Sequence, residues 1–174
     1  MNSEEMLKAD KLLKAREDRV AFVEKLINEY KTPVVCARSN YPGLNKANEI
    51  TEILMTVADR VLTEKLDDKT IFKTKMTTAE GDVIIMVVEG DAIEIKKTTV
   101  EIEHSHELGR FLDIDVYDKE NNSISREHLG YYRRKCFICD EDAHICVRNR
   151  SHHIDEIEDH IRRTVKDYME NNDV

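Results

Sequence analysis

An unbroken apolar run is the feature that most constrains how this chain can fold. Residues 83–88 read Val-Ile-Ile-Met-Val-Val, and so short a run without a polar side chain is typical of a strand buried on both faces. The turn residues Glu80-Gly81-Asp82 precede it, so the sequence predicts a hairpin of strands 70–77 and 83–89. A strand covered on both faces needs strands beside it and helices over it, which favours an α+β fold.

The remaining elements are predicted from apolar spacing and from helix start and stop signals. Residues 91–106 allow two interpretations, because their apolar residues hint at strand alternation. The capping-box spacing of Asp91 and Glu94, and Gly109 as a helix stop, favour a helix there. We therefore expect helices over 3–30, 46–65, 91–106 and 151–170, with further strands over 34–38 and 111–117.

The order of these elements predicts the architecture. From residue 34 it is strand, helix, strand, strand, helix, strand, which is the ferredoxin-like βαββαβ pattern with a four-stranded antiparallel sheet. In that arrangement strand 111–117 pairs with strand 34–38 at a sheet edge. The N-terminal helix then joins the helical layer or covers the far face. We expect one domain over 1–174, with a core at about 33–118 and a Cys/Arg-rich segment plus helix at about 123–170.

An aspartate pair lies in the last predicted strand. Apolar residues at 112, 114 and 116 alternate with Asp113 and Asp115, so the two carboxylates face the same way, about 7 Å apart. Carboxylates held in this way can share a divalent cation. The alternative is an amphipathic strand whose acids are merely solvated.

Basic residues gather after the aspartate pair. Residues 123–153 contain six Lys or Arg against four Asp or Glu, although the whole chain has a net charge of -9. Such a patch suits a polyphosphate, because guanidinium groups bind phosphate oxygens in pairs; the alternative is pairing with neighbouring carboxylates. The overall charge argues against nucleic acid or a membrane surface as partner, and no apolar run approaches the roughly 18 residues that span a bilayer. The six are Arg126, Arg133, Arg134, Lys135, Arg148 and Arg150.

Three of the four cysteines fall within the same region. Cys136 and Cys139 form a Cys-x-x-Cys pair, and Cys146 with His152 could complete a tetrahedral zinc site. His144 could replace His152, and free buried thiols are the alternative to zinc. The remaining cysteine, Cys36, lies in an apolar strand and is most simply a core residue. Four cysteines without a disulfide framework suit a reducing, cytoplasmic compartment.

No nucleophilic serine motif, phosphate-binding P-loop or dinucleotide-binding glycine motif occurs in the sequence. If the chain is an enzyme, metal-assisted phosphoryl or nucleotidyl transfer fits best, because metal ions and arginines stabilise the charge on a transferred phosphoryl group.

Four segments resemble one family in the same order. EHSHELGRFLDIDV (103–116) resembles the signature (E)xxHxLGRLxDIDV of the citrate lyase holo-acyl-carrier-protein synthases, also called apo-citrate lyase phosphoribosyl-dephospho-CoA transferases. ISREHLG (124–130), RKCFIC (134–139) and AHICVRNRSH (143–152) resemble the ISRxxLG, RxCLLC and AxxCxRxRxH elements of that family. The departures include Tyr131-Tyr132, where the family often has a proline-containing pair. Weaker matches are AREDR (15–19) and NYPG (40–43).

The resemblance implies a transferase that acts on 2'-(5''-triphosphoribosyl)-3'-dephospho-CoA. It would attach the phosphoribosyl-dephospho-CoA group to a serine of the citrate lyase acyl carrier (gamma) subunit and release pyrophosphate. Asp113 and Asp115 would hold Mg²⁺, and Asp113, Asp115 or His106 would take the serine proton. The triphosphate would be neutralised by Arg110 and by some of Arg126, Arg133, Arg134, Arg148 and Arg150.

Two other functions and one other fold fit the sequence. The chain could be a non-catalytic, zinc-bearing adaptor whose acidic body binds a partner. It could instead be a related transferase for another carrier protein, such as that of malonate decarboxylase. Gly109-Arg110 followed by Asp113-Ile114-Asp115 is also similar to polymerase-β-like nucleotidyltransferases, although those usually separate the two elements by about ten residues.

Overall fold

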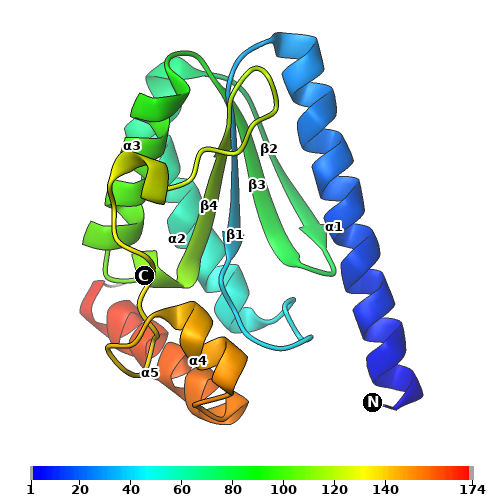
Figure 1. Cartoon of the computed structure of the whole chain (residues 1–174), viewed down its shortest axis with the longest axis vertical. Helices are drawn as coiled ribbons and strands as arrows, with labels where there is room; N and C mark the ends of the chain where they lie inside the picture. Colours follow the sequence, from blue (N-terminus) through cyan, green and yellow to red (C-terminus); the bar gives the residue numbers. More distant parts are fainter. Residues whose placement is uncertain (1, 173–174) are drawn as a thin grey trace.

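The computed structural model describes residues 2–172 and contains one four-stranded sheet. Its strands are β1 (Val34–Ser39), β2 (Thr70–Thr78), β3 (Gly81–Val88) and β4 (Leu112–Tyr117), in the spatial order β2-β3-β1-β4 (Figure 1). Every neighbouring pair is antiparallel. The predicted hairpin and the predicted edge position of the aspartate strand beside β1 are confirmed. All eight residues of β3 are buried, as the apolar run requires.

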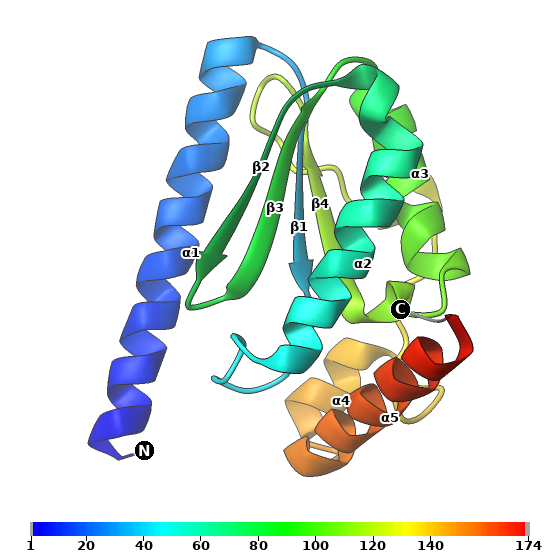
Figure 2. The same ribbon diagram turned by 180° about the vertical axis from the view of Figure 1, so that it is seen from behind.

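Helices cover both faces of the sheet. On one face lie α2 (Glu49–Leu66) and α3 (Ala92–Ser105), which bury Ile84 and Met86 of β3. On the other face lies α1 (Ser3–Tyr30), whose Val23 and Ile27 pack with Ile85 (Figures 1 and 2). The sequence left two positions open for the N-terminal helix, and the structure selects the far face. The helical interpretation of 91–106 is also confirmed.

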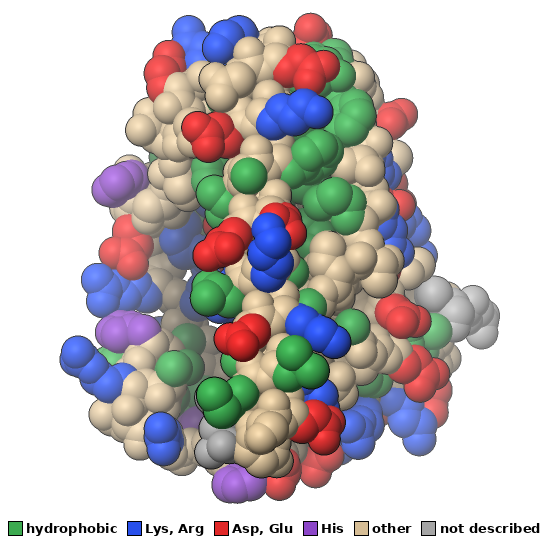
Figure 3. Space-filling view, turned by 90° about the vertical axis from the view of Figure 1, so that its right-hand side faces the viewer, with side chains coloured by type: hydrophobic (Ala, Val, Ile, Leu, Met, Phe, Trp, Pro, Cys, Tyr) green, Lys and Arg blue, Asp and Glu red, His purple; other side chains and the backbone are tan. Residues whose placement is uncertain are grey.

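Local sequence explains where α1 begins, ends and attaches. Asn2 and Glu5 form the capping box, and Lys31 in a left-handed conformation ends the helix before Pro33. Midway along the helix, Arg19 pairs with Glu80 of the β2–β3 turn at 2.7 Å, and both side chains are buried. The N-terminal half extends past the sheet, and exposed hydrophobic side chains alternate with charged ones on this side (Figure 3).

The chain after the sheet forms two helices and a segment with few buried hydrophobic residues. A short helix, α4 (Ala143–Asn149), which the sequence did not predict, precedes α5 (Ile154–Asn172). The predicted helix over 151–170 therefore begins three residues late. The buried residues of α5, Ile161, Val165 and Tyr168, belong to the same hydrophobic core as the buried residues of α2. Residues 123–153, called the Cys/Arg segment below, contain two buried hydrophobic residues, Cys136 and Cys146.

Three 3₁₀ turns complete the described chain, at Asp67–Lys69, Gly109–Phe111 and Glu127–Leu129. The last of them ends at Gly130, which adopts a left-handed conformation. Within residues 2–172, no helix has the length and apolar character needed to cross a membrane.

Candidate functional site

A cavity of about 1180 Å³ lies between the sheet and the Cys/Arg segment. Leu112, Phe137, Val147 and Ile157 give it apolar walls, while six Lys or Arg side chains line the rest. Glu103 is the one acid among its lining residues in the described part of the chain. We call it the basic cavity; it suits an anionic ligand that also carries apolar groups. Its six cations are Arg110, Arg126, Arg133, Arg134, Lys135 and Arg150.

Glu103 of α3 organises one wall of the basic cavity. Its side chain is 3% exposed and accepts hydrogen bonds from Arg126 and, at 2.7 Å, from Arg134. The same carboxylate accepts the Ile114 N–H at 2.9 Å, and Lys96 donates to the Ile114 carbonyl at 2.7 Å. These two bonds satisfy the backbone N–H and C=O of Ile114 at the free edge of β4. Glu103 therefore ties the strand that carries the aspartates to two cavity arginines.

The aspartate pair lies on the opposite side of β4 from Leu112 and Ile114. Arg38 of β1 donates from one guanidinium nitrogen to Asp113 and to Asp115, the latter at 2.9 Å. Arg134 lies 3.0 Å from the other oxygen of Asp113. Asp113 and Asp115 are not among the residues that line the basic cavity, but Asp113 connects with it through Arg134.

The two carboxyls differ in acidity because their partners differ. Burial alone would raise the pKa of Asp113, but Arg38 and Arg134 lower it overall. The pKa of Asp115 is raised, first by burial and then by the negative charge of Asp113. Environments that push two neighbouring pKa values apart suit one carboxylate to act as a base and the other to stay charged.

Arg110 anchors the Cys/Arg segment to the core. Its guanidinium donates to the carbonyls of Lys135, at 3.1 Å, and Cys136, and lies 5.9 Å from the centre of the Phe137 ring. The preceding residue must be glycine, because a Cβ at Gly109 would stand 2.3 Å from the Ile102 carbonyl oxygen. Arg110 lines the basic cavity as expected, and it also has this structural contact.

Two of the expected site residues lie elsewhere. His106 accepts from the Leu108 N–H at 3.1 Å and faces the Tyr168 hydroxyl at 3.5 Å. Burial and the charge of Arg60 lower its pKa. It is not among the residues lining the basic cavity, whereas His104 is. Arg148 is exposed on α4 and is also absent from the lining.

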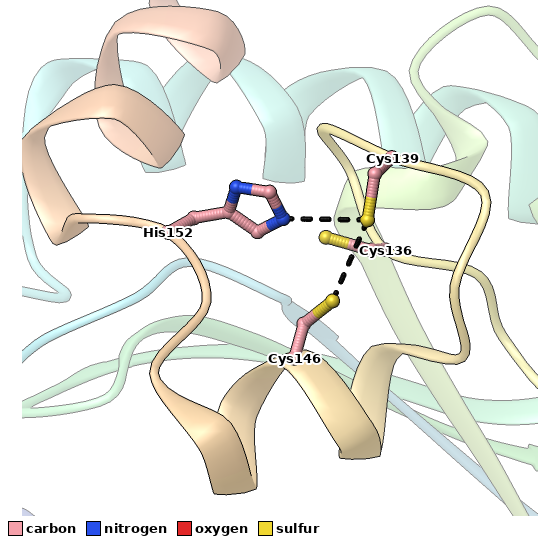
Figure 4. Close-up of side chains that lie close together, drawn as sticks. All are labelled: Cys136, Cys139, Cys146 and His152. Atoms are coloured by element: carbon pink, nitrogen blue, oxygen red, sulfur yellow. Dashed lines mark hydrogen bonds between the residues drawn. The ribbon is translucent and has the colours of Figure 1, made fainter.

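The expected cysteine cluster is assembled. Cys136 and Cys139 from the loop, Cys146 from α4 and His152 from the following loop converge (Figure 4). Cys139 Sγ lies 3.5 Å from Cys146 Sγ and 3.3 Å from His152 Nε2, and all four ligand atoms lie within 4.8 Å of one another. His144, the alternative fourth ligand, does not belong to the group.

This geometry suits a metal ion. A tetrahedral zinc with bonds of about 2.3 Å to sulfur separates its sulfurs by about 3.8 Å, close to the separation found here. The Ile138 N–H faces Cys136 Sγ at 3.5 Å. Although burial opposes it, such backbone N–H groups lower the pKa of Cys136 overall. The cluster could therefore hold a metal such as zinc, and three of its members, Cys136, Cys146 and His152, also line the basic cavity.

Sequence reasoning missed Arg38, Lys96 and Glu103 as site residues. Arg38 pairs across the strands with Asp113, so its role depends on the β1–β4 register. Lys96 and Glu103 are seven residues apart, or about two helical turns, and so share a face of α3. That spacing is the signal that could have drawn attention to them.

A family model described as apo-citrate lyase phosphoribosyl-dephospho-CoA transferase matches residues 7–168. A Vibrio cholerae protein named probable apo-citrate lyase phosphoribosyl-dephospho-CoA transferase is 32% identical over 166 residues, which cover 91% of this chain and 92% of that protein. A Citrobacter koseri protein named apo-citrate lyase phosphoribosyl-dephospho-CoA transferase is 29% identical, covering 84% of this chain and 81% of that protein. The Haemophilus influenzae protein CitXG is 31% identical over 90% of this chain, which matches 34% of its length.

Proposed function

The chain belongs to the apo-citrate lyase phosphoribosyl-dephospho-CoA transferase family, and we propose that it catalyses the transfer which that name describes. The donor is 2'-(5''-triphosphoribosyl)-3'-dephospho-CoA, and the acceptor is a serine of the citrate lyase acyl carrier (gamma) subunit. The serine oxygen forms a bond to the α-phosphorus. The bond from that phosphorus to the β-phosphate oxygen breaks, pyrophosphate leaves, and a carboxylate takes the hydroxyl proton.

One observation carries the proposal. A cavity lined by six Lys or Arg side chains is joined, through Arg134, to a pair of carboxylates of unlike acidity. Phosphoryl transfer needs little covalent help from a protein, but it needs positive charge around the phosphates and a base near the nucleophile. Arg134 contacts both the wall of the basic cavity, which supplies the positive charge, and the carboxylate pair, which supplies the base.

We assign the base to Asp115, because the pKa of that carboxyl is raised and a base works best when its pKa approaches the working pH. Asp113 stays charged and holds Arg134. His106 has no role here, since it packs against Tyr168. The arginines facing the substrate are Arg110, Arg126, Arg133, Arg134 and Arg150, with Arg148 at most peripheral.

Mg²⁺ fits the aspartate pair in one respect. An oxygen of Asp113 and an oxygen of Asp115 already converge on a single cationic nitrogen of Arg38. Because Arg38 and Arg134 compensate these charges, we propose that the metal arrives with the triphosphate rather than alone. Once bound, Mg²⁺ would neutralise charge developing on the leaving phosphates.

We propose zinc as the metal of the cysteine cluster, in a structural role. Three sulfurs and one imidazole are a donor set that zinc favours, and it leaves no open coordination position for chemistry. The four cysteines are free, which supports a reducing compartment such as the cytoplasm.

We also assign the core to the ferredoxin-like class. The element order strand, helix, strand, strand, helix, strand and the antiparallel strand order β2-β3-β1-β4 support this assignment. A polymerase-β-like fold is less well supported, because only two residues lie between Arg110 and Asp113.

The transfer is tested by mass spectrometry of the acyl carrier subunit after incubation with the triphosphate precursor and Mg²⁺. We expect the carrier to gain the mass of the prosthetic group, with pyrophosphate released in equal amount. Asp113→Asn combined with Asp115→Asn should slow the gain by about 10²–10⁴-fold. Asp167→Asn, an exposed change on α5, is the matched control.

Three outcomes contradict the proposal. A mass gain undiminished in the double variant rules out the assigned carboxylates. A gain on the malonate decarboxylase carrier but not on the citrate lyase carrier reassigns the acceptor. No gain on either carrier favours the adaptor alternative.

A further inference from the structure

A second group of charged side chains lies on the α1 side of the sheet, outside the basic cavity. Arg38 stands at the end of β1, and Arg16 and Arg19 of α1 pair with Glu80 at 3.5 and 2.7 Å. Lys46, from the loop after β1, donates to the Tyr41 carbonyl. A Cβ at Gly81 would stand 2.5 Å from the Lys46 carbonyl oxygen, so Lys46 adjoins the turn that carries Glu80. Arg38 pairs across the strands with Val83, two residues after Gly81. Burial and then the charge of Arg16 lower the pKa of Lys46.

Within this group of side chains the cations outnumber the acids by one. The cations Arg16, Arg19, Arg38 and Lys46 face the acids Glu80, Asp113 and Asp115. Arg19 and Glu80 neutralise each other in a buried ion pair. Arg16 remains half exposed, with 50% of its side chain accessible, and Lys46 is part-buried.

We propose that this group, with Arg38 as its principal ligand and Lys46 and Arg16 beside it, binds the pyrophosphate end of the triphosphate, while the basic cavity holds the dephospho-CoA end. The inference rests on the proposed function, since that function supplies a substrate with two dissimilar ends. It assigns a binding role to three residues outside the cavity.

The different linings of the two sites support this division. The basic cavity combines its arginines with Phe137, Val147 and Ile157, and such mixed walls suit a nucleotide base and an alkyl amide arm. On the α1 side the named groups are charged, which suits bare phosphates.

Arg134 stands where the two sites meet. It lies 2.7 Å from Glu103, which lines the cavity, and 3.0 Å from Asp113 on the α1 side. A triphosphate that passes this side chain would bring its α-phosphorus beside Arg134 and within reach of the aspartates. The carrier serine would then approach between the two sites.

Arg38 has to change partners for this to happen. It now donates to Asp113 and Asp115, and a pyrophosphate offers it more oxygens and a higher charge than the two carboxylates. As Arg38 turns to the phosphates, the carboxylate oxygens become free for the cation that accompanies them. Binding of pyrophosphate to Arg38 therefore frees the carboxylates of Asp113 and Asp115.

The test measures binding of magnesium pyrophosphate, and separately of dephospho-CoA, to the full chain by calorimetry. Arg38→Gln should weaken pyrophosphate binding by about 10–100-fold, the equivalent of one charged hydrogen-bonding partner. Its effect on dephospho-CoA should be less than about threefold. Arg133→Gln combined with Arg150→Gln should show the opposite pattern. Arg163→Gln, an exposed change on α5, should alter neither ligand.

The reverse pattern overturns the inference: pyrophosphate binding intact in Arg38→Gln and lost in the cavity double variant. If Arg38→Gln does not fold, Lys46→Gln replaces it, since Lys46 has no hydrogen bond to the aspartates in the described chain, and unchanged pyrophosphate binding there also refutes the inference. Failure of the proposed function is a separate result, because it appears as absent carrier modification while pyrophosphate still binds through Arg38.

Discussion

The sheet and the Cys/Arg segment are stabilised by different kinds of contact, although the site needs both. β3 buries all eight of its residues between α1 on one side and α2 and α3 on the other. The Cys/Arg segment buries two hydrophobic residues, both cysteines of the metal-type cluster. Apolar burial therefore fixes the aspartate strand, whereas ion pairs, the Arg110 contacts and the cluster of three cysteines and His152 lie in the opposite wall. Because the contacts differ, a substitution that destabilises one of the two walls should leave the stability of the other nearly unchanged.

Removing apolar volume from the sheet should have the largest effect on stability. Ile84 is fully buried in β3, so Ile84→Ala should lower the free energy of unfolding by about 2–5 kcal/mol. Urea unfolding followed by circular dichroism measures this. The control is Ile71→Ala on neighbouring β2, where the side chain is 47% exposed and the change should stay within about 0.5 kcal/mol. Equal losses would show that burial of β3 does not dominate.

Glu103→Gln tests the tie between the two regions and should cost less. The amide keeps an acceptor for the Ile114 N–H, but it leaves Arg126 without its counter-charge and Arg134 with Asp113 alone, a loss of about 1–3 kcal/mol. The same urea assay measures it. Glu101→Gln, an exposed position on α3, is the matched control. If the two variants lose equally little, the arginine wall does not depend on Glu103.

Removing one ligand of the proposed zinc site should loosen the Cys/Arg segment while hardly changing the sheet. We expect Cys136→Ser to abolish stoichiometric zinc and to speed amide hydrogen exchange in residues 123–153. The sheet should keep its exchange rates, with its unfolding free energy changed by less than about 1 kcal/mol. Cys36→Ala is the control, because that thiol lies in β1 outside the cluster. Faster exchange throughout the sheet would contradict the independence of the two regions.

The elements of the sheet were easier to predict from the sequence than those of the Cys/Arg segment. The hairpin and the helix over 91–106 were predicted correctly because they follow from local periodicity, turn residues and caps. The edge position of β4 was predicted from the order of the elements along the chain. The face that α1 covers was not predictable, since an amphipathic pattern does not say which surface it meets. The helix α4 was missed because its seven residues span about two turns, too few to show a period.

The site was predictable in its residue types and not in its contacts. The cysteine and histidine ligands came together because their spacing already suited one metal. Arg38 was missed, since its partners lie more than seventy residues away and only the β1–β4 register aligns them. His106 was assigned to the chemistry by its place in a motif, yet the end of α3 turns it towards Tyr168.

The smallest expected effect is a difference in unfolding free energy between Asp113→Asn and Asp115→Asn. Asp113 contacts Arg38 of the sheet and Arg134 of the Cys/Arg segment, whereas Asp115 contacts Arg38. The folded-state pKa of Asp113 is lowered by Arg38 and Arg134 despite burial. Its ionised form therefore stabilises the fold above the unfolded pKa of about 3.9, and this contribution is lost as the pH falls through the lower folded value. Asp113→Asn should destabilise the protein at pH 7 by about 1 kcal/mol, and the loss should disappear in acid.

Asp115→Asn should behave in the opposite way. Burial and the charge of Asp113 raise the pKa of Asp115, so the wild type loses stability as the pH rises from about 3.9 through the raised folded value. The neutral amide avoids that cost, although it gives up one Arg38 contact. The change at pH 7 should therefore be neutral or stabilising by up to about 1 kcal/mol, shrinking below pH 4. Urea unfolding between pH 3 and pH 8 measures both variants. Parallel pH profiles would mean that Arg134 does not distinguish the aspartates, and that the Cys/Arg segment does not reach the acidic half of the site.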